Sequence, residues 1–114
     1  MRQGQRVIRI QKAKGRRLKK LRARDKHYQK KYGITLQLYD KLLQLQNYRC
    51  MVCETMHEES YRKRLSVDHC HATGQVRGLL CRNCNLALGF ARDNPDILKR
   101  LAIYVEFDLK RLRK

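Results

Sequence analysis

The stretch that decides the fold runs from Cys50 to Asn85 and reads CMVCETMHEESYRKRLSVDHCHATGQVRGLLCRNCN. It opens with one Cys-x-x-Cys pair and closes with a second, and an asparagine follows the second pair directly. A two-residue spacer lets a tight turn present both sulfurs to one ion, and structural zinc sites often use two such pairs. The sequence therefore predicts a tetrahedral zinc site. Its four ligands would be Cys50, Cys53, Cys81 and Cys84.

An intracellular location would favour metal binding by these cysteines over disulfide formation. The basic N-terminus lacks the apolar region of a signal peptide, so we expect an intracellular protein whose thiols stay reduced. A redox pair and simply buried cysteines are the alternatives, and two matched pairs in one small domain disfavour both. The fifth cysteine, Cys70, falls outside both pairs, and we expect it to be a small buried residue.

A polar cluster lies inside the loop that the cysteine pairs enclose. Asp68, His69 and His71 follow one another closely there, and Asn85 comes directly after Cys84. On a strand, His69 and His71 share a face and Asp68 points to the other, unless the strand bends. A structural alternative is that Asp68 and His69 only hydrogen-bond within the fold, and another places a histidine on the zinc.

The residue types in this cluster suit phosphodiester hydrolysis. A neutral imidazole such as His69 can take a proton from an attacking water near physiological pH. A hard divalent cation prefers oxygen ligands, and Asp68 and the side-chain oxygen of Asn85 supply two. Such a cation stabilises charge on a phosphate and on a leaving oxygen.

Patterning around the cluster predicts an α+β fold. Residues 65–69 and 76–80 read as two strands joined by a turn in which Gly74 takes a positive φ. A helix is expected over 85–91, after the second cysteine pair. The centre of the chain is therefore strand, turn, strand, cysteine pair and helix.

Helices are predicted on both sides of this centre. Thr35 is suited to cap a helix over 36–46, whose leucines recur at helical spacing. Asn94 is suited to cap a last helix that has Pro95 at its first position. The apolar stripe of that last helix, along 97–112, either covers the core or forms a homodimer contact. We therefore expect either a monomer or a homodimer.

The charge of the chain indicates a polyanionic partner. The net charge is +18, and half of the 28 Lys and Arg residues lie in residues 1–31, where Asp25 is the only acidic residue. Nucleic acid is the first candidate for such a partner, and a membrane is disfavoured because no long apolar run is present. Residues 1–31 are predicted to form a basic arm, helical over 16–31 or disordered, on the phosphate backbone. The predicted contacts are Arg16, Arg17, Lys19, Lys20, Arg22, Arg24, Arg77 and Arg82.

Several segments within 32–89 resemble the recombination endonuclease VII family of HNH, or His-Me finger, nucleases. They are YGIT, LLQLQNYRCMVC, VDHCHATGQVRGLLCRNCN and LALG. The resemblance implies a ββα-metal fold over 32–114, flanked by helices and stapled by zinc on the four cysteines. It also implies that Asp68 and Asn85 hold a catalytic Mg²⁺ or Mn²⁺, that His69 is the general base, and that His71 supports the phosphate or the metal.

The function that follows is a metal-dependent DNA endonuclease, acting on duplex or branched DNA and leaving a 5′-phosphate and a 3′-hydroxyl. Members of this family are common in phage genomes, so we expect a phage-encoded protein in the bacterial cytoplasm. A Holliday-junction resolvase proper is one alternative, although Leu88 stands where the junction-resolving prototype has an acidic residue. A non-catalytic zinc module that binds nucleic acid is another, and RNA is an alternative substrate.

Overall fold

The computed structural model describes residues 3–113. It forms two units, one that ends at Leu45 and one that starts at Gln46. The second unit contains the two strands and all four paired cysteines, so it is the α+β core that the sequence predicts. No helix in the described part of the chain is both long and apolar enough to cross a membrane.

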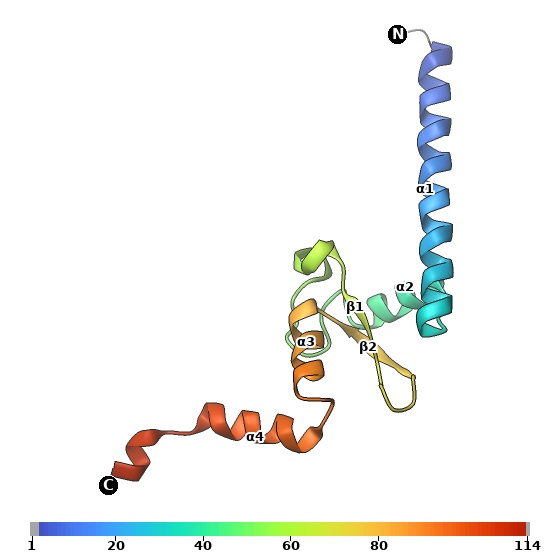
Figure 1. Cartoon of the computed structure of the whole chain (residues 1–114). Helices are drawn as coiled ribbons and strands as arrows, with labels where there is room; N and C mark the ends of the chain where they lie inside the picture. Colours follow the sequence, from blue (N-terminus) through green and yellow to red (C-terminus); the bar gives the residue numbers. More distant parts are fainter. Residues whose placement is uncertain (1–2, 114) are drawn as a thin grey trace. The chain divides into compact units, whose positions relative to one another are not determined.

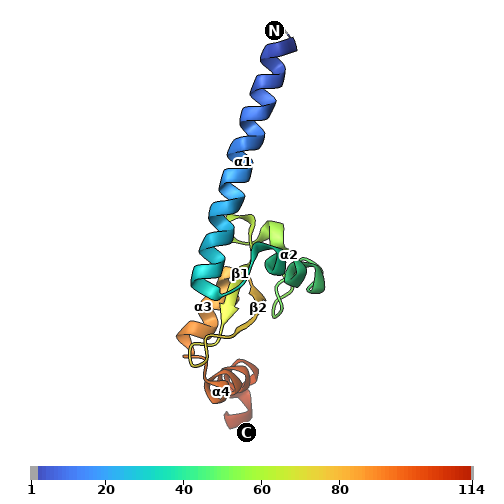
Figure 2. The same cartoon turned by 90° about the vertical axis from the view of Figure 1, so that its right-hand side faces the viewer.

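The first unit begins with α1 (Gln3–Tyr32), which is one uninterrupted helix in both views (Figures 1 and 2). The sequence suggested a helix only over 16–31, yet α1 continues through Gly15. A glycine inside a helix costs about 1 kcal/mol, and the Lys, Arg and Gln residues around it are good helix formers. The side chains from Gln11 to Arg24 are all exposed, so α1 presents positive charge on every side.

The second helix, α2 (Leu36–Leu45), starts at the predicted cap. The Thr35 hydroxyl oxygen accepts a hydrogen bond from the Leu38 amide at 3.1 Å. A second cap comes from α1, where the Asp25 carboxylate accepts from the Leu36 amide at 2.8 Å. Two of the four free amides at the helix start are thus satisfied, which is what a capped N-terminus requires.

Aromatic stacking connects α1 and α2. The rings of Tyr28 and Tyr39 are stacked with their centroids 5.3 Å apart, and both side chains are buried. The chain turns between the two helices at Gly33, whose φ of +70° is readily adopted only by glycine.

The second unit is built on an antiparallel hairpin of β1 (Ser66–His69) and β2 (Val76–Leu80). The turn contains Gly74 at φ +75°, as the sequence predicts. The pairing slips by one residue between Asp68 and His69. Such a bulge bends the strand and changes where side chains point, so strict alternation does not hold at the polar cluster.

The helix α3 (Arg82–Phe90) packs against both strands. It begins three residues earlier than the sequence suggested, because Cys81 is its N-cap: the Cys81 sulfur accepts a hydrogen bond from the Cys84 amide at 3.4 Å. The second cysteine pair is therefore part of a helix start, and Asn85 lies within the helix. Together the hairpin and the helix form the predicted ββα core.

The Gln46 side chain makes the hydrogen bonds to β2 that a third strand would otherwise make at Leu79. Its amide nitrogen donates to the Leu79 carbonyl and its amide oxygen accepts from the Leu79 amide, both at 2.8 Å. A Cβ placed on Gly78 would lie 3.2 Å from the same Gln46 oxygen, so glycine suits this close approach. The hydrogen bonds of the buried Leu79 backbone are completed by this side chain.

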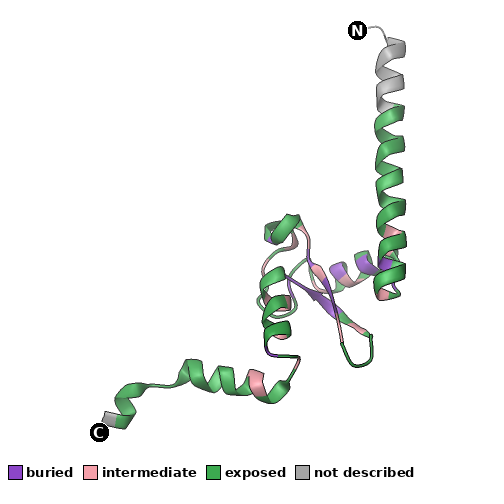
Figure 3. Ribbon diagram, in the orientation of Figure 1, coloured by how far each residue is buried: buried purple, intermediate pink, exposed green. Residues whose placement is uncertain are grey.

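The last helix, α4 (Pro95–Glu106), has the predicted cap. The Asn94 side-chain oxygen accepts from the amides of Asp96 and Ile97. The helix ends at Glu106, before the end of the predicted apolar stripe, and a short 3₁₀ helix (Leu109–Arg113) follows. Ile97 and Leu98 at the start of α4 are half-buried, and the apolar side chains from Leu101 onward are mostly exposed (Figure 3). Helical spacing predicts an apolar face but carries no information about what covers that face.

Candidate functional site

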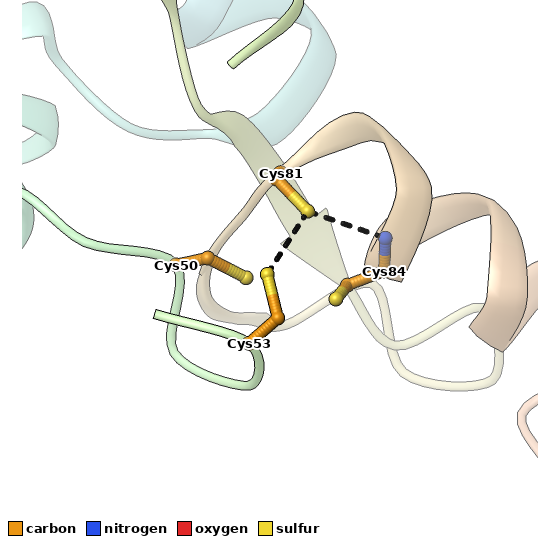
Figure 4. Close-up of side chains that lie close together, drawn as sticks. All are labelled: Cys50, Cys53, Cys81 and Cys84. Carbon is orange, nitrogen blue, oxygen red and sulfur yellow. Dashed lines mark hydrogen bonds between the residues drawn. The ribbon is translucent and has the colours of Figure 1, made fainter. Parts of the chain in front are cut away.

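The four paired cysteines converge in the second unit. Their sulfur atoms all lie within 4.8 Å of one another, and the Cys53 and Cys81 sulfurs are 3.5 Å apart (Figure 4). Zn–S bonds of about 2.3 Å in a tetrahedron place sulfurs about 3.8 Å apart. The cluster therefore has the donor set and the dimensions of a structural zinc site. The sequence-predicted ligands are brought together as expected.

Each cysteine pair is held by local backbone geometry. The Cys50 amide donates to the Thr55 carbonyl at 2.8 Å, and the Glu54 amide donates to the Cys50 carbonyl at 3.1 Å. Glu54 has a φ of +65°, which closes the tight turn around the first pair. The second pair sits at the start of α3, so a loop and a helix N-terminus each present two sulfurs.

The pKa values of the clustered thiols are shifted in opposite directions. A hydrogen bond from the Thr55 hydroxyl lowers the pKa of Cys53 to about 6. Burial raises the pKa of Cys84 instead. Four thiolates this close repel one another, and a divalent metal removes that repulsion by binding them all.

The polar cluster is organised around Arg77, on β2. Its Nε and Nη2 atoms donate to the two oxygens of the Asp68 carboxylate at 2.8 and 3.0 Å. Asp68 is buried, whereas the Arg77 side chain is 38% exposed. The hydrogen bonds to Asp68 raise the pKa of Arg77 above its ordinary value, so the guanidinium stays charged.

A second carboxylate joins the same network. Asp93 accepts from Arg77 Nη2 at 3.2 Å through Oδ1, and its Oδ2 lies 2.7 Å from Nδ1 of His71. The hydrogen bonds from His71 and Arg77 hold the pKa of the Asp93 carboxyl below its ordinary value. The rings of His71 and His69 have their centroids 5.0 Å apart. The two histidines are therefore neighbours at the end of β1.

Oxygen donors for a hard cation lie on adjacent elements. Asp68 is on β1 and Asn85 is on α3, which packs against that strand. Arg77 takes up one lone pair on each oxygen of Asp68, and each carboxylate oxygen keeps a second one. Mg²⁺ commonly takes one or two protein oxygens and completes its shell with water and phosphate oxygens. The donor chemistry of these two residues fits such an ion.

Most of the predicted phosphate contacts lie on α1. All six residues named from that helix are exposed. Arg77 is exposed in part, with its guanidinium engaged by Asp68 and Asp93. Arg82, at the start of α3, lies over the ring of Tyr61 with 4.2 Å between the guanidinium carbon and the ring centroid. The two predicted contacts in the second unit, Arg77 and Arg82, thus have protein partners.

Two features of the site were not evident in the sequence. Asp93 was not singled out, because it reaches His71 across 22 positions and reads as part of the turn before Pro95. Cys70 is half-buried rather than buried, since it follows the end of β1 in the turn. The sequence shows only that Asp93 is an acidic residue just after the short helix that follows the second cysteine pair.

Comparison with known proteins gives one family match. The sequence model described as "Recombination endonuclease VII" matches residues 25–107, which is most of the chain. The matched range covers both cysteine pairs, the polar cluster and Asp93. No solved structure matches the chain.

Two phage proteins are similar to the chain. The Gene 59 protein of Mycobacterium phage D29 is 48% identical over 75 residues, which is 65% of this chain and 44% of that protein. The Gene 59 protein of Mycobacterium phage L5 is 47% identical over 75 residues, with the same two shares. The chain therefore spans less than half of the length of these phage gene products.

Proposed function

The chain belongs to the recombination endonuclease VII family, and from this premise we propose that it is a nuclease that hydrolyses phosphodiester bonds in duplex or branched DNA. The observation that carries the proposal is the placement of the polar cluster. Asp68 and His69 end β1, beside the helix that carries Asn85, on a core whose four sulfurs suit zinc. A zinc module that only binds nucleic acid would account for the cysteines and the charge, but not for this cluster.

Each residue of the cluster has a proposed role. The imidazole of His69 takes a proton from the attacking water, whose oxygen then bonds to phosphorus. The bond from phosphorus to the 3′ oxygen breaks, and that oxygen takes up a proton to leave a 3′-hydroxyl and a 5′-phosphate. Asp68 and Asn85 would hold Mg²⁺ or Mn²⁺, which when bound supplies positive charge at the phosphate and the leaving oxygen.

The two metals have separate tasks in this proposal. Zinc on the cysteines would tie the start of α3, the helix that carries Asn85, to the loop of Cys50 and Cys53. A divalent cation held by Asp68 and Asn85 would supply positive charge for the reaction. The exposed cations of α1 would hold the phosphate backbone without reading its sequence.

The test uses three DNA substrates and two variants. The whole chain is incubated with supercoiled plasmid, linear duplex and a synthetic four-way junction, with and without Mg²⁺. We expect Mg²⁺-dependent cleavage, which His69→Ala lowers by about 100- to 10,000-fold while zinc stays bound. Asp96→Ala, at an exposed position outside the polar cluster, is the control and should cleave like the wild type.

Each outcome separates the candidate functions. Cleavage of the junction much faster than of the duplex would identify a resolvase, and equal rates would identify a general endonuclease. Tight binding of all three substrates without cleavage would identify a non-catalytic zinc module. Wild-type cleavage by a zinc-loaded His69→Ala variant would contradict the role of His69.

A further inference from the structure

Asp93 lies in the turn between α3 and α4 and contacts two side chains of the hairpin region. One carboxylate oxygen is 2.7 Å from His71 Nδ1, and the other accepts from Arg77 at 3.2 Å. We propose that Asp93 is a positioning residue of the site: it holds the His71 imidazole directly and, through Arg77, the Asp68 carboxylate. The inference rests on the proposed nuclease function.

The chemistry of the pair fixes the tautomer of His71. An ionised carboxylate only accepts hydrogen bonds, so the proton between Asp93 and His71 belongs to Nδ1. The neutral ring then keeps its lone pair on Nε2. A carboxylate on one ring nitrogen sets the orientation of an imidazole and the availability of its other nitrogen. Because the His71 side chain is 71% exposed, that second nitrogen is available to substrate.

The backbone of the turn aims the Asp93 side chain. Arg92 and Asp93 have φ values of +57° and +52°, a region that residues with a side chain seldom adopt. The turn is closed by hydrogen bonds from the Asp93 amide to the Leu88 carbonyl at 2.9 Å and from the Arg92 amide to the Gly89 carbonyl at 3.0 Å. This pair of bonds is a common way to end a helix, so the end of α3 fixes the point from which the Asp93 side chain starts.

The surroundings of Asp93 suit a phosphate group. His71, Arg77 and Arg92 line an open pocket of about 520 Å³ together with Asp93. Asp93 is the only carboxylate among the lining residues and is only 17% exposed. A carboxylate that faced the phosphate would repel it. Both oxygens of Asp93 instead accept hydrogen bonds from the neighbouring His71 and Arg77 side chains. This arrangement is expected of a residue that orients other side chains.

The first test reads the tautomer of His71 and does not depend on cleavage. In long-range ¹H–¹⁵N NMR spectra of the zinc-loaded chain at pH 8, the His71 signals are assigned with His71→Gln. We expect the proton on Nδ1 in the wild type and a mixture of tautomers in Asp93→Ala. Asp96→Ala removes a carboxylate of the same kind from an exposed position three residues away and should leave the spectrum unchanged. A proton on Nε2 in the wild type, or the same tautomer in Asp93→Ala, would overturn the proposal.

The second test separates positioning from general stability. We expect Asp93→Asn to lower kcat by about 10- to 100-fold, the usual effect of losing a group that orients a site residue, with KM within about 3-fold of the wild type. Asp93→Glu, which keeps the charge, should recover part of the loss, and Asp96→Asn should lose nothing. In a His71→Ala background, Asp93→Asn should lose less than it does in the wild type, because only the contact of Asp93 with Arg77 remains to be removed.

The failures of the two proposals are distinguishable. A wild-type chain that cleaves none of the DNA substrates would contradict the proposed function, and the NMR tautomer would still decide whether Asp93 holds His71. A full additional loss in the His71→Ala background, or a rise in KM with kcat unchanged, would overturn the positioning role while leaving the nuclease function intact.

Discussion

At the scale of single residues, Arg77 has the largest set of partners in the polar cluster. It is predicted from sequence as a phosphate contact, yet its guanidinium donates to Asp68 and Asp93. Arginine suits this task because its rigid fork can bind one carboxylate with two nitrogens and still reach a second. A buried carboxylate such as Asp68 requires a cationic partner, because an unpaired buried charge is strongly unfavourable.

Removing that partner should destabilise the second unit. We expect Arg77→Ala to lower its free energy of unfolding by about 1–3 kcal/mol, since the hydrogen bonds of a buried charge are lost. Differential scanning calorimetry on the zinc-loaded chain measures the change. Arg82→Ala, whose guanidinium lies over the Tyr61 ring, is the control and should change stability by less than about 1 kcal/mol. Equal losses of unfolding free energy in the two variants would mean that the ion pair of Arg77 and Asp68 does not stabilise the second unit.

At the scale of elements, two glycines with open surroundings differ only in backbone conformation. Gly74 in the hairpin turn has a φ of +75°, whereas Gly89 lies inside α3, and no atom lies within 4 Å of a Cβ added at either. We expect Gly74→Ala to destabilise by about 1–2 kcal/mol because of the left-handed conformation. Gly89→Ala should stabilise by about 0.5–1 kcal/mol. Urea unfolding checks both signs, and two changes of the same sign would contradict the assigned turn.

The two kinds of cysteine should respond differently to substitution. Cys84 belongs to the four-sulfur cluster, whereas Cys70 lies outside it. We expect Cys84→Ser to lose zinc and the cooperative thermal transition of the second unit, because structural zinc supplies much of the folding free energy of small domains. Cys70→Ser should keep one zinc per chain. Metal analysis together with calorimetry checks both variants. A zinc-free Cys84→Ser chain with an unchanged thermal transition would contradict a structural zinc site.

Local sequence signals predicted the elements that depend on local chemistry. The Thr35 and Asn94 caps, the turn glycine and the two cysteine pairs all have short-range causes, and each is observed. The start of α3 differs from the predicted one because the sulfur of Cys81 caps the helix, a task that usually falls to an oxygen side chain. The contacts of Gln46 and Asp93 could not be predicted, because they join residues 33 and 22 positions apart through side chains that other chemistries use equally well.

At the scale of the whole molecule, positive charge is concentrated on one helix. The apolar stripe that accompanies most surface helices is replaced on α1 by cations from Gln11 to Arg24, all of them exposed. Such a helix is stabilised little by its own packing, so phosphate binding and helix formation should support each other.

Salt dependence measures how many of these cations reach phosphates. We expect a variant with Lys19, Lys20, Arg22 and Arg24 changed to Gln to bind duplex DNA more weakly and with a shallower salt dependence. Each lost phosphate contact lowers the slope of log K against log salt by about 0.9. A variant with Lys99, Arg100, Lys110 and Arg111 changed to Gln has the same net charge and is the control. Equal slopes in both variants would show that α1 has no special part in binding.

The Gln46 side chain also has a consequence for how copies of this chain behave together. An edge strand with unpaired amides and carbonyls is a template on which another chain can add a strand, which is how many aggregates begin. In β2 the outward-facing amide and carbonyl of Leu79 are already occupied by the Gln46 amide. The Met51 amide donates to the same Leu79 carbonyl at 3.3 Å. A neighbouring molecule therefore finds no free pairing partner at Leu79, and this part of the β2 edge is closed to an added strand.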